Sequence, residues 1–352
     1  MNVLILGGTG VISTSVVKHC IEKGYKVSCV NRGRRKNDNS SLDVTIYNCD
    51  VSDSQTLRIL LAGKKYDSVV DFLCYSAETL QSHMKTLKGL VKQYVLISTD
   101  SVYKVKKDGD TYQENDELGN PIWQYSTGKV ACENFIKEHH EEYGMAYTIV
   151  RPAVTFGNTR IPYGLMPKEG FHYFLIDRIR TGKYIPVWNK GNNISTIIRS
   201  EDFARFFVPL LGNEQAYSQT FNVSGDEYVT NAEVLQWVSD YVGQEVKTLD
   251  VSVKSITNVF KDKVGEFAVD RAYDHKVSNA KIKYLTGFSC SMTVREGIEK
   301  SISYYEKNNY CSGIDYFFDG QLDRVINDSK MAAERQRFVN YRQMGGGNFQ
   351  SY

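Results

Sequence analysis

The 352-residue sequence predicts an α/β fold with a doubly wound, mostly parallel sheet and a smaller mixed subdomain toward the C-terminus. Two observations carry this prediction. Short apolar runs alternate with helical patterns as far as Arg151, and a glycine-rich turn directly follows the first apolar run. Right-handed crossovers between parallel strands place helices on both faces of such a sheet, and ligands bind beyond the carboxyl ends of its strands.

The expected strands are short runs rich in β-branched residues, and the expected helices lie between them. The strands cover Val3–Leu6, Val27–Asn31, Thr45–Asn48, Ser68–Phe72, Tyr94–Ser98 and Ala146–Arg151. The helices cover Ser13–Lys23, Ser54–Ala62, Ala77–Gly89 and Ser126–Tyr143. This alternation favours parallel pairing, because parallel neighbours need a long crossover connection and hairpins do not.

The glycine-rich turn leads from the first strand into the first helix and reads Gly-Gly-Thr-Gly-Val-Ile-Ser over residues 7–13. A dinucleotide-binding turn requires this context, because glycines bend the chain tightly and let the backbone approach a pyrophosphate at the helix N-terminus. Ser13 stands where the pattern expects a third glycine, so its hydroxyl is available to a phosphate. The alternative is an ordinary strand-to-helix turn. The cofactor contacts predicted in this turn are Gly7, Thr9, Gly10, Val11 and Ile12.

The domain organisation follows from this turn. Residues 1–157 are predicted to form a dinucleotide-binding domain of the Rossmann type. Residues 158–311 are predicted to form a substrate subdomain, from which about 195–225 returns to the first domain as a helix and a strand. Residues 312–352 are a polar C-terminal extension.

The end of the second strand favours NADP over NAD. An acidic residue at this position binds the ribose of NAD and repels the extra phosphate of NADP, but this sequence has Asn31 there. A basic run follows, and Arg32 and Arg34 are predicted to grip that phosphate. The alternative is a solvated basic loop, with Asn31 bonding the ribose of NAD.

Composition excludes several kinds of partner. Lys and Arg total 43 against 41 Asp and Glu, so the net charge of +2 argues against nucleic acid and against an anionic membrane surface. No run approaches the roughly 20 apolar residues that cross a bilayer, and the N-terminus lacks a signal-peptide pattern. The seven cysteines have no C-x-x-C spacing and the six histidines have no ligand spacing. We therefore expect reduced thiols, a cytoplasmic protein and no metal.

A second motif carries acid–base chemistry. Tyr125 and Lys129 lie four residues apart at the start of a predicted helix, so both side chains project from one face. A nearby ammonium and a positive nicotinamide ring would both favour the phenolate form of the tyrosine. Thr99 and Asp100 end an apolar strand at the edge where ligands bind, and Thr99 could hydrogen-bond the reacting oxygen. The alternatives are a surface Tyr–Lys pair and ordinary turn chemistry.

Five segments stand in the order found in the extended short-chain dehydrogenases/reductases, the NAD-dependent epimerase/dehydratase family, which the sequence therefore resembles over about nine-tenths of its length. These segments are Gly7 to Ser13, Asp50-Val51, Ser98 to Tyr103, Tyr125 to Lys129 and Arg151 to Gly157. The resemblance implies that Tyr125 is the acid/base and that Lys129 lowers its pKa and holds ribose hydroxyls. It also implies that Thr99 takes the place of the family's catalytic Ser or Thr.

Further binding residues rest on the same resemblance. Cofactor contacts are implied at Asp50, Val51, Leu73, Cys74, Pro152 and Val154, in addition to Lys129. Substrate contacts are implied at Thr99, Asn158, Tyr173 and Arg199. Arg199 is the expected phosphate fork, and its alternative is a surface charge beside Glu201 and Asp202.

Family members mostly act on nucleotide-linked sugars, so the leading hypothesis is an NAD(P)-dependent epimerase or keto-reductase of a nucleotide sugar. Ser101 stands where the similar 4,6-dehydratases have a glutamate that abstracts a proton, which argues against dehydration, although Asp100 is retained as an acid. The alternatives are an NADP-dependent reductase of another small carbonyl compound and a non-catalytic cofactor-sensing or RNA-binding relative. A homodimer is left open.

Overall fold

The computed structural model describes residues 1–33, 42–308 and 313–345, apart from the side chains of residue 338 and residues 341–345. Its centre is a seven-stranded sheet in the order β10-β6-β5-β4-β1-β2-β3, in which every neighbouring pair is parallel. The predicted doubly wound α/β class is confirmed. The strands are β1 Asn2–Leu6, β2 Lys26–Asn31, β3 Val44–Asn48, β4 Tyr66–Asp71, β5 Val91–Ile97, β6 Ala146–Pro152 and β10 Gln219–Val223.

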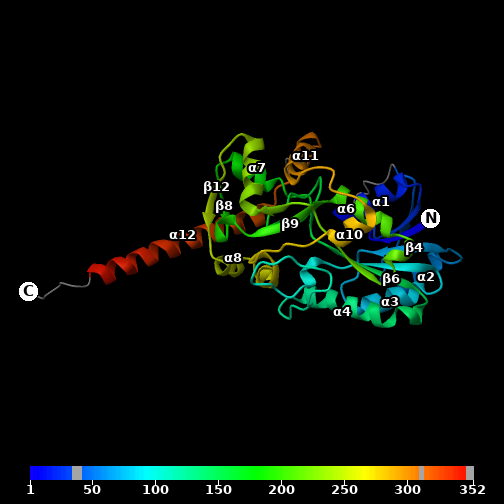
Figure 1. Ribbon diagram of the computed structural model, residues 1–352. Helices are drawn as coiled ribbons and strands as arrows, with labels where there is room; N and C mark the ends of the chain where they lie inside the picture. The colour runs from blue at the N-terminus through cyan, green and yellow to red at the C-terminus, as the bar shows by residue number, and fades with distance from the viewer. Residues whose placement is uncertain (34–41, 309–312, 346–352) are drawn as a thin grey trace, which may run out of the picture.

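Helices cover both faces of this sheet (Figure 1). Because successive side chains of a strand point to opposite faces, Val3 and Ile5 of β1 join one apolar layer while Leu4 and Leu6 join the other. The first layer is covered by α1 Val11–Glu22 and α6 Ser200–Phe207, and the second by α2 Ser54–Leu60, α3 Ala77–Leu87 and α4 Gln124–His139. Burial on both faces explains why these strands are nearly continuous apolar runs.

The second part of the molecule is mixed, as the sequence predicts. A three-stranded sheet contains β7 Val154–Phe156, β9 Ile194–Arg199 and β11 Tyr228–Thr230, and β8 Tyr184–Val187 pairs with β12 Lys247–Asp250. The helices around these strands are α5 Phe174–Arg180, α7 Asn231–Val242, α8 Val253–Val259, α9 Val264–Glu266, α10 Ala280–Thr286 and α11 Val294–Lys307. Apolar side chains of these strands and of α5, α7, α8 and α11 form a separate large core cluster, whereas Ile282 of α10 joins the layer that α1 and α6 cover.

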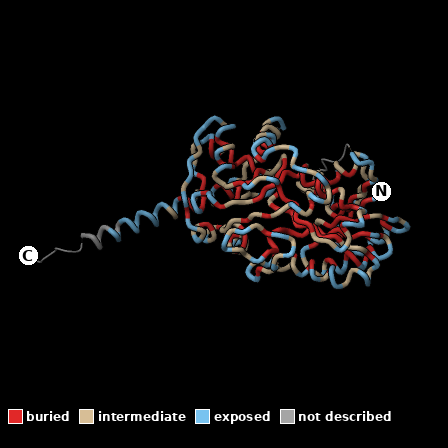
Figure 2. The backbone as a smooth tube through the Cα atoms, in the orientation of Figure 1, coloured by how far each residue is buried: buried red, intermediate tan, exposed pale blue. Residues whose placement is uncertain are grey.

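The C-terminal helix α12, Tyr316–Gly345, leaves the body of the molecule as a single long rod (Figure 1). Its first turns pack Phe318, Leu322 and Val325 into the second core. Arg178 holds the same turns through Asp319 at 2.5 Å and Asp323 at 2.7 Å. The turns over residues 331–337 are exposed (Figure 2). In the described part of the chain, no helix combines the length and apolar character needed to cross a membrane.

Candidate active site

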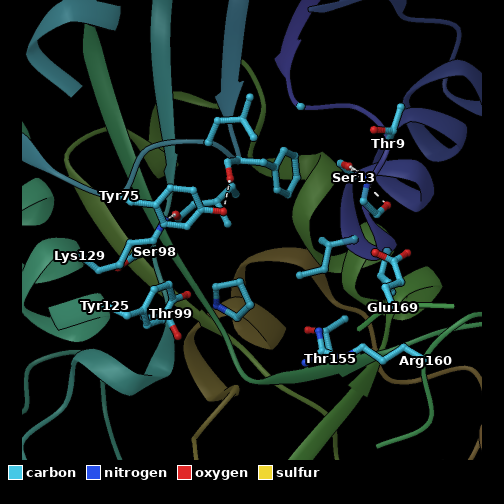
Figure 3. A pocket seen from close by; sticks show the side chains of 18 of the residues that line it. Thr9, Ser13, Tyr75, Ser98, Thr99, Tyr125, Lys129, Thr155, Arg160 and Glu169 are labelled. Atoms are coloured by element: carbon cyan, nitrogen blue, oxygen red, sulfur yellow. Dashed lines mark hydrogen bonds between the residues drawn. The ribbon is translucent and has the colours of Figure 1, made fainter. Parts of the chain in front are cut away.

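A cavity of about 930 Å³ opens at the carboxyl ends of the parallel strands. Tyr125, Thr99 and Lys129 lie together on one wall, and Thr9 and Ser13 of the glycine turn lie across from them (Figure 3). The strands β1, β2, β4, β5 and β6 all end at this cavity. Ligands of doubly wound folds bind at this edge, so the cavity is the candidate active site.

The glycine turn forms the wall at the end of β1. Gly7 has φ +89°, and a Cβ at this position would lie 2.8 Å from Leu73 Cγ, so only glycine fits. At Gly10 a Cβ would approach nothing nearer than Ser13 Oγ at 3.4 Å, so the cavity side of this residue is open to a ligand. Ser13 Oγ accepts the Gly10 N–H at 2.8 Å, which gives this hydroxyl a capping role at the start of α1.

Asn31 connects the glycine turn to the end of β2. Its side-chain oxygen accepts the Gly8 N–H at 2.8 Å. A side chain at Gly8 would collide with Cys29, whose Sγ would lie 2.7 Å from the added Cβ. Asn31 therefore stabilises the shape of the turn as well as lining the cavity next to Arg32.

Lys129 lies in the wall of the cavity and is almost fully buried. Its ammonium donates to the carbonyls of Cys74 at 2.6 Å and Ile97 at 2.7 Å and lies 4.6 Å from the centre of the Tyr75 ring. Gly128 makes this arrangement possible, because a Cβ there would lie 2.3 Å from the Tyr75 carbonyl oxygen. Burial lowers the pKa of Lys129, and nearby thiols and carboxylates oppose that effect only in part.

Tyr125 lies against the rings of Trp123 and Tyr75, at centroid distances of 5.0 and 6.2 Å. Burial raises the pKa of Tyr125 above the usual value for a tyrosine. A hydrogen bond with Thr99 lowers this pKa, but by less than burial raises it. The expectation that Lys129 lowers this pKa is not reproduced by the chain's own groups. Two backbone carbonyls hold the Lys129 ammonium, and the cation that lowers the pKa of Tyr125 is Arg160.

A buried ion pair supports the strand end that carries Thr99. Glu133 of α4 accepts two hydrogen bonds from Arg151 of β6, at 2.9 and 2.6 Å, and a third from Ser98 at 2.6 Å. Arg151 also donates to the Tyr103 hydroxyl at 2.9 Å. The role of Glu133 could not be recognised in the sequence, because nothing local distinguishes it from the exposed Glu138 of the same helix.

The part of the chain that follows β7 contributes a charged wall to the cavity. In this wall, the Glu266 carboxylate forms ion pairs with Arg271 and with Lys263, each with a nitrogen–oxygen distance of 3.0 Å. Burial lowers the pKa of His172 to about 3, with a further contribution from Arg160, so this histidine is neutral. This wall could not be recognised in the sequence, because its residues come from two distant segments without a shared motif. The charged wall comprises Arg160, Glu169, His172, Lys263, Glu266, Asp270 and Arg271.

Most of the residues predicted from sequence line this cavity: Gly7, Thr9, Gly10, Val11, Ile12, Asn31, Arg32, Leu73, Thr99, Asp100, Tyr125, Lys129, Pro152 and Val154. Arg34 lies outside the described residues. Cys74 is not in the lining but contributes the carbonyl that holds Lys129.

Asp50 and Val51 do not line the cavity. β3 ends at Asn48, so Asn48 and Cys49 occupy the sheet edge in their place. Asp50 instead accepts hydrogen bonds from the Ser52 N–H and hydroxyl, and Val51 packs into the apolar layer beneath the sheet.

The three substrate contacts implied at Asn158, Tyr173 and Arg199 also lie outside the lining of this cavity. The Arg199 guanidinium donates to Asn158 at 2.5 Å and to the Gly297 carbonyl at 2.7 Å, and it faces a smaller cavity of about 370 Å³. Tyr173 packs against Tyr305 in the second core. These side chains are engaged in joining α11 to the sheet and in filling that core, which corrects the expectation.

The fold is of the doubly wound α/β class with a cavity at the carboxyl ends of its strands, and the comparison with known families makes this class specific. The model of the NAD dependent epimerase/dehydratase family matches residues 3–224. The chain belongs to this family. The predicted resemblance is therefore confirmed.

Two curated relatives are similar over different spans. The chain is 28% identical over 240 residues to the chloroplast stem-loop binding protein of 41 kDa b from Arabidopsis thaliana, a match covering 65% of this chain and 60% of that protein. It is 23% identical over 357 residues to dTDP-glucose 4,6-dehydratase 1 from Escherichia coli (strain K12), covering 88% of this chain and 93% of the enzyme.

Solved structures share the fold at low sequence identity. UDP-glucose 4-epimerase from Thermotoga maritima, solved with UDP-glucose, superposes with a TM-score of 0.70 and 19% identity, covering 88% of this chain and 100% of that one. UDP-glucuronic acid 4-epimerase from Bacillus cereus, solved with UDP-glucuronic acid and NAD, has a TM-score of 0.70 and 16% identity with the same coverage.

Proposed function

We propose that the protein is an NAD(P)-dependent oxidoreductase or epimerase of a nucleotide-linked sugar, with proton transfer by Tyr125 and hydride transfer at a ring carbon. The observation that carries this proposal is the single cavity in which the glycine turn, the Tyr125–Thr99–Lys129 wall and the charged wall meet. A dinucleotide at the glycine turn and a sugar at Tyr125 would both contact this one space.

The residues at the glycine turn fit a dinucleotide. Gly7 bends the chain, Gly10 leaves space for close approach, and α1 begins at the cavity with its positive dipole end. A nicotinamide bound there supplies the acceptor or donor of hydride, and its positive oxidised ring would favour the Tyr125 phenolate. Lys129 would donate an N–H to the ribose, because its ammonium has three N–H groups and backbone carbonyls accept only two of them.

Tyr125 and Thr99 would handle the reacting oxygen. The Tyr125 oxygen would accept the proton of a sugar hydroxyl as that carbon is oxidised, and it would return the proton when the carbonyl is reduced. The Thr99 hydroxyl would donate to the same sugar oxygen and hold it in place. Arg160 of the charged wall is the proposed partner for the diphosphate, in place of Arg199.

A panel experiment tests the proposal. The purified protein is incubated with NAD or NADP and with UDP-glucose, UDP-glucuronic acid and dTDP-glucose in turn, and products are followed by mass spectrometry and NMR. Conversion of a nucleotide sugar supports the proposal. Cofactor binding without conversion of any sugar would contradict it and favour the non-catalytic alternative.

We also propose that NADP is preferred to NAD. Among the described residues, the cavity wall at the end of β2 contains Asn31, Arg32 and Gly33 and no carboxylate that would repel the 2′-phosphate. Arg32→Ala is expected to weaken NADP binding about tenfold or more, because one charge-assisted hydrogen bond contributes about 1.5–3 kcal/mol. NAD affinity should change little. Fluorescence titration of both cofactors measures this.

The matched control is Arg324→Ala on α12, whose side chain is exposed and far from the cavity lining. It should leave both affinities unchanged. The preference is refuted if NAD binds as tightly as NADP and Arg32→Ala alters neither affinity.

A further inference from the structure

Three ionisable side chains from distant parts of the sequence are buried together beside the reacting wall. Asp100 follows β5, and Asp270 and His275 lie in the segment after α9. Their exposed fractions are 4%, 5% and 2%. His275 Nε2 lies 3.4 Å from Asp100 Oδ2, and His275 Nδ1 lies 4.0 Å from Asp270 Oδ1. Both carboxyl groups line the cavity, and the imidazole lies outside the lining.

Ser101 connects this cluster to the strand end that carries Thr99. The Ser101 hydroxyl donates to Asp270 Oδ2 at 3.3 Å. Ser101 is the position at which the similar dehydratases have a glutamate. The carboxyl group of Asp270 therefore lies against Ser101, the position at which the dehydratases have a carboxyl group and this chain does not.

The segment that carries Asp270 is held firmly. Residues Phe267–Arg271 form a π-helical turn, a feature frequently found at functional sites. Trp188 Nε1 donates to the Arg271 carbonyl at 2.6 Å, and the Ile194 N–H donates to Asp274 at 2.9 Å. The ring of Tyr112 packs on His275 at a centroid distance of 4.7 Å. Asp270 is thus fixed in position before any ligand binds.

Hydrogen bonding in the cluster is incomplete within the described chain. Asp100 Oδ2 and both ring nitrogens of His275 are buried without an aligned hydrogen-bond partner. Buried polar atoms are nearly always paired, so such a group points to a ligand or to a proton in transit. Burial also raises the pKa of Asp270, and Arg271 and His275 offset that effect only in part, which makes the ionised carboxyl a stronger base.

We propose that Asp270 is a second catalytic residue, which removes the proton from the ring carbon next to the carbonyl that forms at Tyr125. This inference rests on the proposed function. In the step, the C–H bond breaks and its proton passes to a carboxylate oxygen of Asp270. The electron pair of the bond forms the enolate of the existing carbonyl. Return of the proton to the same carbon restores the ketone, so no further oxidant or reductant is needed.

The proposal extends the chemistry that the sequence predicts. Oxidation and re-reduction act only at the carbon that carries the reacting oxygen, whereas an acid/base group at the neighbouring carbon also makes the hydrogen of that carbon exchangeable with solvent. With Asp100 beside it as an acid, the same group would allow loss of a hydroxyl from the next carbon as water, which the sequence argued against because of Ser101.

Exchange of the ring hydrogen with solvent tests the proposal. The full-length protein is incubated with NAD or NADP and with UDP-glucose or dTDP-glucose in deuterium oxide. Cofactor reduction is followed by absorbance, and deuterium in the recovered sugar is followed by mass spectrometry and NMR. The wild-type protein is expected to introduce deuterium at the carbon next to the oxidised one. Asp270→Asn is expected to lower the ratio of deuterium exchange to cofactor reduction about 10²-fold or more.

The ratio does not depend on how much of a variant folds, and two further variants sharpen the result. Asp274→Asn removes a charge from the same segment, keeps an acceptor for the Ile194 N–H and lies outside the cavity lining, so the ratio should stay at the wild-type value. Ser101→Glu in the Asp270→Asn background returns a carboxylate to the same place and should restore exchange.

The possible failures are distinguishable. Absence of both cofactor reduction and sugar conversion by the wild-type protein with every sugar would overturn the proposed function and this inference with it. Cofactor reduction without deuterium exchange, or an exchange ratio that Asp270→Asn leaves unchanged, would overturn this inference alone.

Discussion

Changing Tyr125 to phenylalanine is expected to lower turnover of a nucleotide sugar by about 10² to 10⁴-fold, the usual effect of removing a general acid or base. Phenylalanine keeps the ring that packs between Trp123 and Tyr75 and removes only the hydroxyl that faces Thr99. Cofactor affinity should therefore change little. Initial rates and fluorescence titration measure the two effects separately.

The matched control is Tyr284→Phe, which removes a hydroxyl from an almost fully exposed tyrosine on α10 and should leave turnover unchanged. Because burial raises the pKa of Tyr125, the oxidation direction, which needs the phenolate, should speed up as the pH rises. A Tyr125→Phe variant with wild-type turnover would show that another group transfers the proton.

Changing Glu133 to alanine is expected to destabilise the fold by about 3–5 kcal/mol, the usual cost of breaking a buried ion pair by removing one partner. Arg151 would remain buried without its carboxylate, and the Ser98 hydroxyl would lose its acceptor. This loss of stability comes from leaving the Arg151 charge buried without a partner. It is therefore larger than the stability that the intact ion pair contributes. Denaturant-induced unfolding, monitored by circular dichroism, measures the change in the free energy of unfolding.

Glu138→Ala on the same helix is the control, because this glutamate is exposed and its substitution should change the free energy of unfolding by less than about 0.5 kcal/mol. Equal unfolding midpoints for the Glu133 and Glu138 variants would refute the structural role assigned to the buried pair. The Glu138 variant should also leave the cofactor site unchanged, since this residue does not line the cavity.

The sequence by itself determined the features that depend on neighbours along the chain. Strands buried on both faces are short apolar runs, so their positions along the chain and the fold class could be predicted from pattern alone. The glycine turn and the Tyr125–Lys129 pair are also local. A glycine turn after a strand reaches the same sheet edge in every such fold, and a spacing of four brings two helical side chains onto one face.

Local pattern was less reliable where the argument depended on the exact end of an element. The motif at Asp50 and Val51 was recognised, but β3 stops at Asn48 and the cavity contacts fall two residues earlier. The four-residue spacing likewise predicted that Lys129 lies at the site, but it could not predict the hydrogen-bond partners of Lys129. The carbonyls of Cys74 and Ile97 hold its ammonium, and the pKa of Tyr125 is raised instead of lowered as a result of burial.

Only the tertiary structure decided which polar side chains meet. Arg199 has the chemistry of a phosphate fork, yet in the fold its guanidinium is engaged by the Gly297 carbonyl and Asn158. Asp270 carries no motif, yet the docking of its segment onto β9 brings it to Ser101, 169 positions away in the sequence. The physical reason is that the sequence pattern shows only which residue types recur and at what spacing. The partners, burial and pKa of a side chain depend on segments that only folding brings together.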